Sequence, residues 1–128
     1  MDPISNMLIS MKNGAMVSKE TVVVPHSKIK LAILECLKRA NFIEDVKALV
    51  KRDRPMIEIT LRYVDGKSKI SDVKRISKQS RRMYAGIRDI KSVKNGFGVT
   101  VFSTPKGILT DKEAKKEQVG GEVLFEIW

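Results

Sequence analysis

Alternation of apolar and polar side chains from Ile57 to Tyr63, within the segment MIEITLRYV (residues 56–64), is the sequence feature that most limits the fold. In an extended chain one face would carry the apolar residues and the other the polar ones: Ile57, Ile59, Leu61 and Tyr63 against Glu58, Thr60 and Arg62. This period of two predicts a half-buried antiparallel strand. A second extended segment, residues 42–50, precedes it across the charged turn 51–55.

Two amphipathic helices are expected before these strands. The first begins at Asp2 as N-cap and Pro3 as first helical residue, and its apolar face consists of Ile4, Met7, Leu8 and Met11. A short β-branched strand follows at 21–25. Ser27 then caps the second helix and Asn41 stops it, and its apolar stripe consists of Ile29, Ile33, Leu34 and Leu37. The first half therefore reads α-β-α-β-β, with two helices covering one face of the sheet.

The second half begins after a turn at Asp65-Gly66. Short strands are expected within 69–77 and 82–86, a single helical turn within 87–93 and a buried strand over 96–102. Thr110 and Glu113 have the spacing of a capping box and start a helix that Gly120 ends, before a last strand over 122–128. We therefore expect an α+β fold with two small subdomains, residues 1–65 and residues 66–128. The second is mostly antiparallel β with one or two short helices.

The charge of the chain points to a polyanionic partner. Lys and Arg number 25 against 15 acidic residues, which gives a formal net charge of +10. Residues 67–82 carry seven of these cations and one acid, Asp72. Such an excess favours nucleic acid, with an anionic membrane surface as the alternative, although that would require a basic amphipathic helix. A solvated basic face without a partner is the plainer interpretation of residues 67–82.

Catalysis finds little support in the sequence. His26 is the single histidine and follows a proline at a strand-to-helix turn, where a surface histidine is the ordinary interpretation. Cys36 falls on the buried side of the second helix and is expected to be a core residue. We expect no metal site and no cofactor, because clusters of His and Cys, a dinucleotide fingerprint and a P-loop are all missing from the sequence. The lone cysteine, the lack of a leader and the lack of a long apolar run indicate a cytoplasmic protein.

Residues 102–107, FSTPKG, are the strongest candidate for a binding loop, placed between the buried strand and the capped helix. Ser103 and Thr104 offer hydroxyls that suit base edges, phosphates and ribose 2′-hydroxyl groups. Pro105 stiffens the loop, Lys106 supplies a cation for phosphate, and Gly107 permits a close approach or a positive φ. The alternative is an ordinary turn in which the hydroxyls close the turn and cap the helix.

Two further residues allow a binding interpretation and a structural one. Tyr84 follows Arg81-Arg82, an arrangement typical of surfaces that stack bases and hold phosphates, but Tyr84 could equally be a core residue of a short strand. Glu122 repels phosphate yet can accept hydrogen bonds from base amino groups or a 2′-hydroxyl. Taken alone, Glu122 could also be a plain surface residue at the start of a strand.

The order of these segments resembles the family of bacterial small-subunit ribosomal protein eight over essentially the whole chain. The resemblance rests on DPISNMLISMKNG, VPHSKIK, RISK and, above all, the C-terminal run NGFGVTVFSTPKGILTDKEAKKEQVGGEVLFEIW. It implies a structural protein without enzymatic activity that binds a helical junction in the central domain of small-subunit ribosomal RNA and helps that domain assemble. It also implies that the C-terminal subdomain carries most of the RNA-contacting surface.

The same resemblance implies which residues and partners are involved. The RNA-binding residues of the second half would be Arg81, Arg82, Tyr84, Ser103, Thr104, Pro105, Lys106, Gly107, Gly120, Gly121 and Glu122. A neighbouring RNA segment would meet Asp2, Pro3, Lys12, Asn13 and Lys30. Other implied partners are the small-subunit ribosomal proteins five and twelve and the messenger RNA of the chain's own operon, and the implied location is the ribosome in the cytoplasm.

Two positions depart from the family pattern. Pro105 stands where a serine hydroxyl is usual, and Lys78-Gln79-Ser80 replaces a Lys-Pro-Gly turn that leads toward Tyr84. A free-standing DNA-binding regulator that uses residues 67–82 is the competing hypothesis. It would need a recognition helix in that segment, which instead predicts strand and turn.

Overall fold

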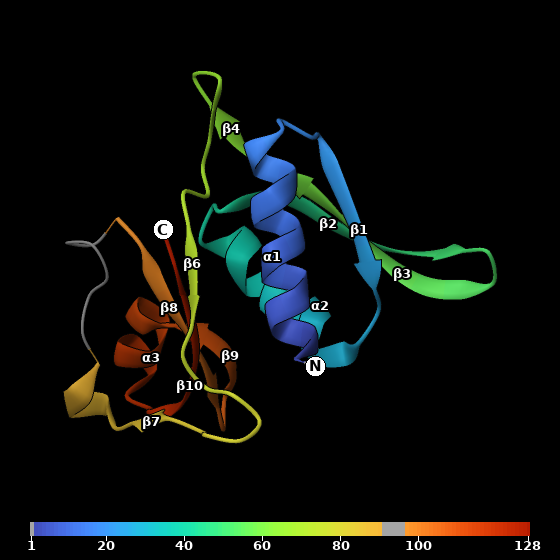
Figure 1. Ribbon diagram of the computed structural model, residues 1–128. Helices are drawn as coiled ribbons and strands as arrows, with labels where there is room; N and C mark the ends of the chain where they lie inside the picture. The colour runs from blue at the N-terminus through green and yellow to red at the C-terminus, as the bar shows by residue number, and fades with distance from the viewer. Residues whose placement is uncertain (1, 91–96) are drawn as a thin grey trace. The chain divides into compact units, whose positions relative to one another are not determined.

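The computed structural model describes residues 2–90 and 97–128 (Figure 1). Two compact units make up the chain: one comprises Pro3–Ser71, and the other comprises Asp72–Trp128 together with Asp2. The subdomain boundary that the sequence favours, between residues 65 and 66, lies in a turn of the first unit and stays a prediction.

The first unit contains two helices and a three-stranded antiparallel sheet. Its elements are α1 (Pro3–Met16), β1 (Thr21–Pro25), α2 (Lys28–Arg39), β2 (Ile43–Lys51) and β3 (Arg54–Leu61), followed by the hairpin β4 (Tyr63–Val64) and β5 (Lys67–Ser68). The strand order in the sheet is β1-β3-β2. The predicted α-β-α-β-β order is confirmed.

Alternation along β3 decides which face of this sheet is covered. Ile57, Ile59 and Leu61 are buried, whereas the residues between them are half-buried. Helix α1 contacts β1 and α2 contacts β2. The buried side chains of both helices complete this core: Ile4, Met7, Leu8, Met11, Ile33, Leu34, Cys36 and Leu37. The core assignment of Cys36 is confirmed.

The inward face of α2 differs from the predicted stripe at one residue. Ile29 is 44% exposed, and the inward position of the first turn is taken by Lys30, which is 7% exposed. Lys30 lies three and four residues before Ile33 and Leu34, so it shares their face of the helix. Its Nζ donates to the carbonyl oxygen of Pro25 at 2.8 Å, which gives the buried ammonium group a hydrogen-bond partner.

Both ends of α2 are capped by the residues that the sequence indicates. Ser27 Oγ accepts a hydrogen bond from the Lys30 N–H at 3.2 Å. At the C-terminus Asn41 has a φ of 65°, its N–H donates to Lys38, and the N–H of Phe42 donates to Leu37. This pair of bonds is the Schellman arrangement, which closes the last carbonyls of a helix. Just beyond, Lys38 Nζ donates to Asp45 Oδ1 and thereby lowers the pKa of that carboxyl group.

The β2–β3 turn is shorter than the sequence indicates. Only Arg52 and Asp53 lie outside the strands, with φ values of 53° and 61°, and Lys51 pairs with Arg54. Two consecutive residues of positive φ form the turn type whose twist matches an antiparallel hairpin. Arg54 and Pro55, predicted as turn residues, therefore belong to β3.

The second unit is an antiparallel sheet with one short α-helix. Its elements are β6 (Val73–Arg75), β7 (Tyr84–Ala85), the 3₁₀ helix η1 (Ile87–Asp89), β8 (Val99–Thr104), β9 (Gly107–Thr110), α3 (Asp111–Glu117) and β10 (Gly121–Ile127). The strand order is β6-β10-β8-β9, and β7 also pairs with β10. The predicted class is confirmed. Strand β10 is the central one, since it bonds β8 on one side and β6 and β7 on the other.

Three predictions for this unit are corrected. Residues 102–107 do not form a loop between strand and helix, because β8 continues to Thr104 and β9 returns from Gly107 (Figure 1). Helix α3 ends through Gln118, which has a φ of 56°, and not through Gly120. The strands expected within 69–77 and 82–86 shrink to β6 and β7. Part of the expected turn 87–93, and Gly96 of the expected strand, lie outside the described residues.

The capping box at the start of α3 yields a stability prediction. Thr110 Oγ1 accepts from the Glu113 N–H at 3.2 Å, and Glu113 Oε1 accepts from the Thr110 N–H at 3.0 Å. We expect Thr110→Ala to lower the free energy of unfolding by about 0.5–2 kcal/mol, because it removes both the cap and its packing. Urea denaturation followed by the fluorescence of Trp128, the single tryptophan, measures this loss in the unit that contains the helix.

Lys116→Ala is the matched control, since Lys116 is exposed on the same helix and takes no part in the cap. Equal midpoints and slopes for the two variants would contradict a stabilising role of the capping box.

Candidate nucleic-acid interface

A row of side chains crosses the sheet of the second unit. Glu122 on β10 pairs with Tyr84 on β7 and with Ser103 on β8, and Ser103 pairs in turn with Ile108 on β9. Directly paired residues of antiparallel strands place their side chains on the same face. Tyr84, Glu122 and Ser103, which are far apart in the sequence, therefore share one face.

Tyr84 is a surface residue. Its side chain is 69% exposed, so the interpretation of Tyr84 as a core residue is wrong. An exposed aromatic ring on a strand offers a flat apolar plane at the position where the row begins.

The turn between β8 and β9 is closed by one of the two hydroxyl groups. Thr104 Oγ1 accepts from the Lys106 N–H at 3.1 Å and donates to the carbonyl oxygen of Gly107 at 2.8 Å. Pro105 occupies the first turn position, where its fixed φ is suitable, and Gly107 takes a φ of 111°. The structure thus gives Thr104 the turn-closing role that the sequence offered as an alternative.

The Ser103 hydroxyl, unlike that of Thr104, takes no part in closing the turn. Ser103 is half-buried, and within the described ranges its hydroxyl forms no hydrogen bond to another group of the chain. Its donor and acceptor capacity is therefore available to a ligand.

Lys106 extends from the turn toward the end of α3. Its Nζ donates to the carbonyl oxygen of Glu117 at 3.2 Å and lies 3.5 Å from Glu117 Oε2. Both side chains are about half exposed, and exposed pairs of this kind contribute only about 0–1 kcal/mol. The ammonium group can therefore exchange this partner for a phosphate at little cost.

Glu122 is held by a neighbouring cation. Arg82 Nη1 lies 3.2 Å and 3.4 Å from the two carboxylate oxygens, and the Glu122 side chain is 16% exposed against 57% for Arg82. The guanidinium group fixes the carboxylate and offsets its negative charge, so the acid is less repulsive to a polyanion than the sequence alone indicates.

Gly120 and Gly121 have a role that the sequence did not reveal. A Cβ atom at Gly121 would overlap the carbonyl oxygen of Ser103, and one at Gly120 would overlap that of Ala85. Glycine at both positions lets β10 lie close to β8 and β7 at the point where the row crosses the sheet.

A buried serine that sequence reasoning missed positions the arginines and Tyr84. Ser77 is fully buried, and its Oγ accepts from the Met83 N–H at 2.8 Å and donates to the Met83 carbonyl at 3.1 Å. Between them, Lys78 and Arg81 exchange backbone hydrogen bonds of 2.9 Å and 3.0 Å across Gln79-Ser80. The departure from the family's Lys-Pro-Gly turn is therefore compatible with a regular turn, and Arg81 is exposed beside it.

The candidate residues of the N-terminal half do not form one group. Pro3 and the buried Lys30 line a hollow of about 370 Å³, whereas Asn13 lines a different one of about 580 Å³. Lys12 is half-buried on α1. Asp2 belongs to the second unit, where its carboxylate accepts from Arg75 Nε at 2.7 Å.

Residues 2–90 and 97–128 contain no group of three or more His, Cys, Asp or Glu side chains that could hold a metal ion. No helix in the described part of the chain is long and apolar enough to cross a membrane.

Comparison with known proteins finds relatives over nearly the whole length of the chain. The family model described as "Ribosomal protein S8" matches residues 2–128. A protein of Erythrobacter litoralis named "Small ribosomal subunit protein uS8" is 39% identical over 127 residues, which cover 99% of this chain and 97% of the relative. Proteins of the same name from Burkholderia lata and Stenotrophomonas maltophilia are 42% and 43% identical, over 96% of this chain and 94% of each relative. A family match over nearly every residue, with relatives of this identity and coverage, shows that the chain belongs to the ribosomal protein S8 family.

Proposed function

We propose that this chain binds a helical junction in the central domain of small-subunit ribosomal RNA and helps that domain to assemble. Its family consists of ribosomal components that have no enzymatic role. The observation that carries the proposal is the row of Tyr84, Glu122 and Ser103 beside the Thr104–Gly107 turn. We propose that the second unit, with residues 66–71, is the main RNA-binding subdomain.

The chemistry of the row suits irregular RNA better than a regular duplex. A-form RNA hides its major groove, so sequence-specific contacts are made at junctions and bulges, where bases are unpaired or splayed. Tyr84 supplies a ring on which a base can stack. The Ser103 hydroxyl can bond a base edge or a 2′-hydroxyl, and the Glu122 carboxylate can accept from a base amino group.

Cations around the row supply the attraction to the RNA backbone. Lys106 and Arg81 are exposed, and the formal net charge of the chain is +10. Contacts of these cations with phosphates would orient the RNA without reading its sequence. The phosphates and the bases would then be recognised by different side chains.

The N-terminal half would make additional contacts. We infer that Pro3, Lys12, Asn13 and Lys30, with Asp2, meet a neighbouring RNA segment. Small-subunit proteins five and twelve are proposed neighbours in the particle. A segment of the operon's messenger RNA that has the shape of the junction would fit the same row.

A DNA-binding regulator is less well supported. The basic segment 67–82, all of which the structure describes, contains β5, β6 and turns but no α-helix. A reader of the DNA major groove would need a recognition helix or a two-stranded ribbon placed in the groove. Comparing the affinities for duplex DNA and for structured RNA by gel shift distinguishes the two hypotheses.

Ser103 and Lys106 should affect RNA binding in different ways. We expect Ser103→Ala to weaken binding to the junction RNA roughly fivefold, because the hydrogen bond between the Ser103 hydroxyl and the RNA, of about 1 kcal/mol, is lost. Binding to a random duplex should stay unchanged. Lys106→Ala should weaken binding to both the junction RNA and the random duplex, and it should reduce the slope of log K against log salt by about 0.7–0.9. Filter binding over a salt series measures both quantities.

Ser71→Ala is the control for Ser103→Ala, since Ser71 is an exposed serine outside the row. If Ser103→Ala kept the full preference for the junction over the duplex, Ser103 would have no role in recognising the junction.

The ring of Tyr84 should matter more than its hydroxyl. We expect Tyr84→Ala to cost about 1–3 kcal/mol of junction binding, whereas Tyr84→Phe keeps most of the affinity, because stacking needs only the aromatic plane. Thermal unfolding should change little in either variant, since the side chain is exposed. Isothermal titration with the junction RNA checks this prediction, and an equal loss for Phe and Ala would assign the contact to the hydroxyl instead.

A further inference from the structure

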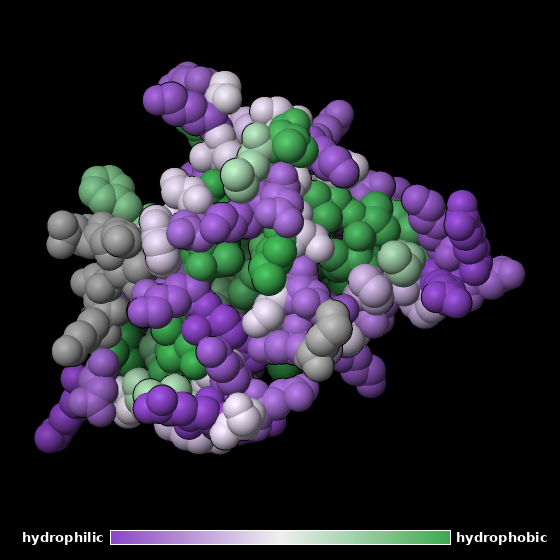
Figure 2. Space-filling view, viewed as in Figure 1, coloured by the Kyte–Doolittle hydropathy of each residue, from purple (hydrophilic) through white to green (hydrophobic). Residues whose placement is uncertain are grey.

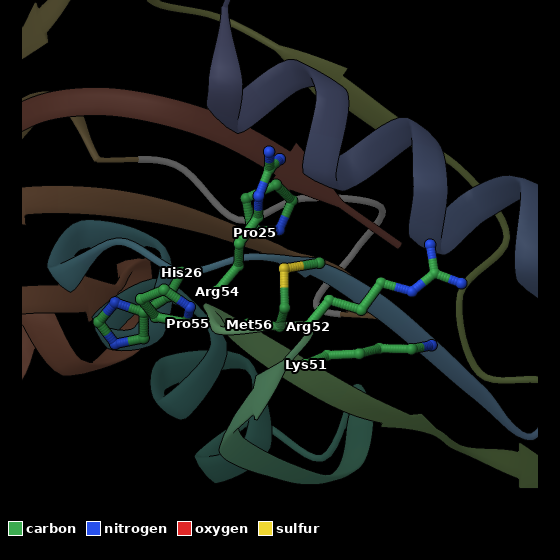
Figure 3. A pocket seen from close by; sticks show the side chains of 7 residues that line it. All are labelled: Pro25, His26, Lys51, Arg52, Arg54, Pro55 and Met56. Carbon is green, nitrogen blue, oxygen red and sulfur yellow. The ribbon is translucent and has the colours of Figure 1, made fainter.

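A second surface rich in cations lies in the first unit, at the end of the β2–β3 hairpin. An open hollow of about 860 Å³ is lined there by Pro25, His26, Lys51, Arg52, Arg54, Pro55 and Met56 (Figure 3). The proposed function uses none of these seven residues. We call this set the hairpin hollow.

Strand register explains how the hairpin hollow is assembled. Met56 on β3 pairs with Pro25 on β1 and with Leu49 on β2, and Lys51 pairs with Arg54. Paired residues, and residues two apart along a strand, lie on the same face, so Met56, Pro25, Arg54 and Lys51 share the face opposite to the buried Ile57 and Ile59. Pro55 precedes Met56 just beyond the end of β1 and completes the lining from the edge of β3. The N–H of His26 donates to the Pro55 carbonyl at 3.1 Å and fixes the histidine beside this face.

The rim of the hairpin hollow carries positive charge that has no internal partner. Lys51, Arg52 and Arg54 are exposed, and none of them forms an ion pair in the parts of the chain that the structure covers. Two acidic residues lie near the hairpin hollow. Asp53 is in the β2–β3 turn, and Glu58 follows Met56 by two residues on β3 and pairs with Lys47. Figure 2 shows hydrophilic side chains gathered at the tip of this hairpin. Three unpaired cations around one hollow favour a ligand with several negative charges.

The floor of the hairpin hollow is apolar. Pro25 and Pro55 are exposed, and Met56 is half-buried. In the view of Figure 3, Met56 lies between His26 with Pro55 on one side and Lys51 with Arg52 on the other. Flat imidazole and guanidinium groups can stack on a nucleobase, and Met56 can pack against its edge. An acidic peptide would use the cations but would leave these planes without a partner.

We propose that the hairpin hollow is a second RNA site, which binds an unpaired stretch of RNA. Phosphates contact Lys51, Arg52 and Arg54, while one base packs on Met56 and Pro25 and stacks against His26 or Arg54. The ligand is single-stranded, because a base inside a duplex cannot reach the apolar floor. This site goes beyond the proposed function, whose junction row lies in the second unit and whose additional contacts in the first unit are Pro3, Lys12, Asn13 and Lys30.

Fluorescence anisotropy of the full-length chain with a fluorescein-labelled 12-nucleotide oligouridine tests the proposal. The triple variant Lys51→Ala/Arg52→Ala/Arg54→Ala should bind the oligonucleotide at least tenfold more weakly. Its slope of log K against log salt should fall by about 2, as expected for three contacts of roughly 0.7 each on a single strand. Met56→Ser should weaken oligouridine binding severalfold at unchanged slope, because it alters the floor and leaves the charges in place.

The matched control is Lys19→Ala/Lys28→Ala/Lys47→Ala, which removes the same charge from exposed positions outside the hairpin hollow. Ser103→Ala reports on the junction row, so a failure of that row and a failure of the hairpin hollow give different results. Equal losses in the two triple variants would overturn the proposal, as would full affinity in Met56→Ser. Preference for a 12-base-pair RNA duplex or for an oligoglutamate peptide over oligouridine would also overturn it.

Discussion

The close approach of three backbone segments at Gly120 and Gly121 is the constraint on which the second unit depends. Strand β10 bonds β8 on one side and β7 on the other, and a side chain at either glycine would overlap a carbonyl oxygen of a neighbouring segment. This closeness sets the register that brings Tyr84, Glu122 and Ser103 into one row. In the proposed RNA complex, the glycines would therefore contribute through the position of their neighbours, and that role needs no contact of their own with RNA.

Adjacent hydroxyls in this unit have separate roles. Thr104 uses its hydroxyl to close the β8–β9 turn, and Ser103 keeps its own available. Pro105 fits this division, because the first position of the turn needs a fixed φ and no N–H donor. A proline in place of the family's serine removes one hydroxyl but holds the turn beside which Ser103 lies. Stiffening of this kind lowers the entropy that is lost when a partner orders the turn.

Local patterns predicted most of the fold, and non-local pairing accounts for what they missed. The stripe of α2, the cap at Ser27, the stop at Asn41 and the alternation of β3 involve neighbours in the sequence, and the structure confirms them apart from Ile29. Strand β9 escaped prediction because GILT has only four residues and no alternation, so its pairing with β8 is visible only in the sheet. Ser77 and the hairpin hollow escaped for the same reason: their partners lie on other strands or across a turn. The only sequence signal for Ser77 was its place in the segment RISK, which resembles the family. That resemblance did not indicate which group the serine contacts.

Charge and shape act at different ranges in this chain. Unpaired cations draw a polyanion over about a Debye length, roughly 8–10 Å at moderate salt, and they do so whatever the sequence of the RNA. In the proposed RNA complex, Ser103, Glu122 and the ring of Tyr84 would act only in contact, so they would discriminate between RNA sequences after the encounter. Because Arg82 neutralises Glu122, the row can present a carboxylate to a base without repelling the phosphates beside it. In the proposed RNA complex, the placement of that one ion pair would allow a strongly basic protein to use an acidic side chain for base recognition.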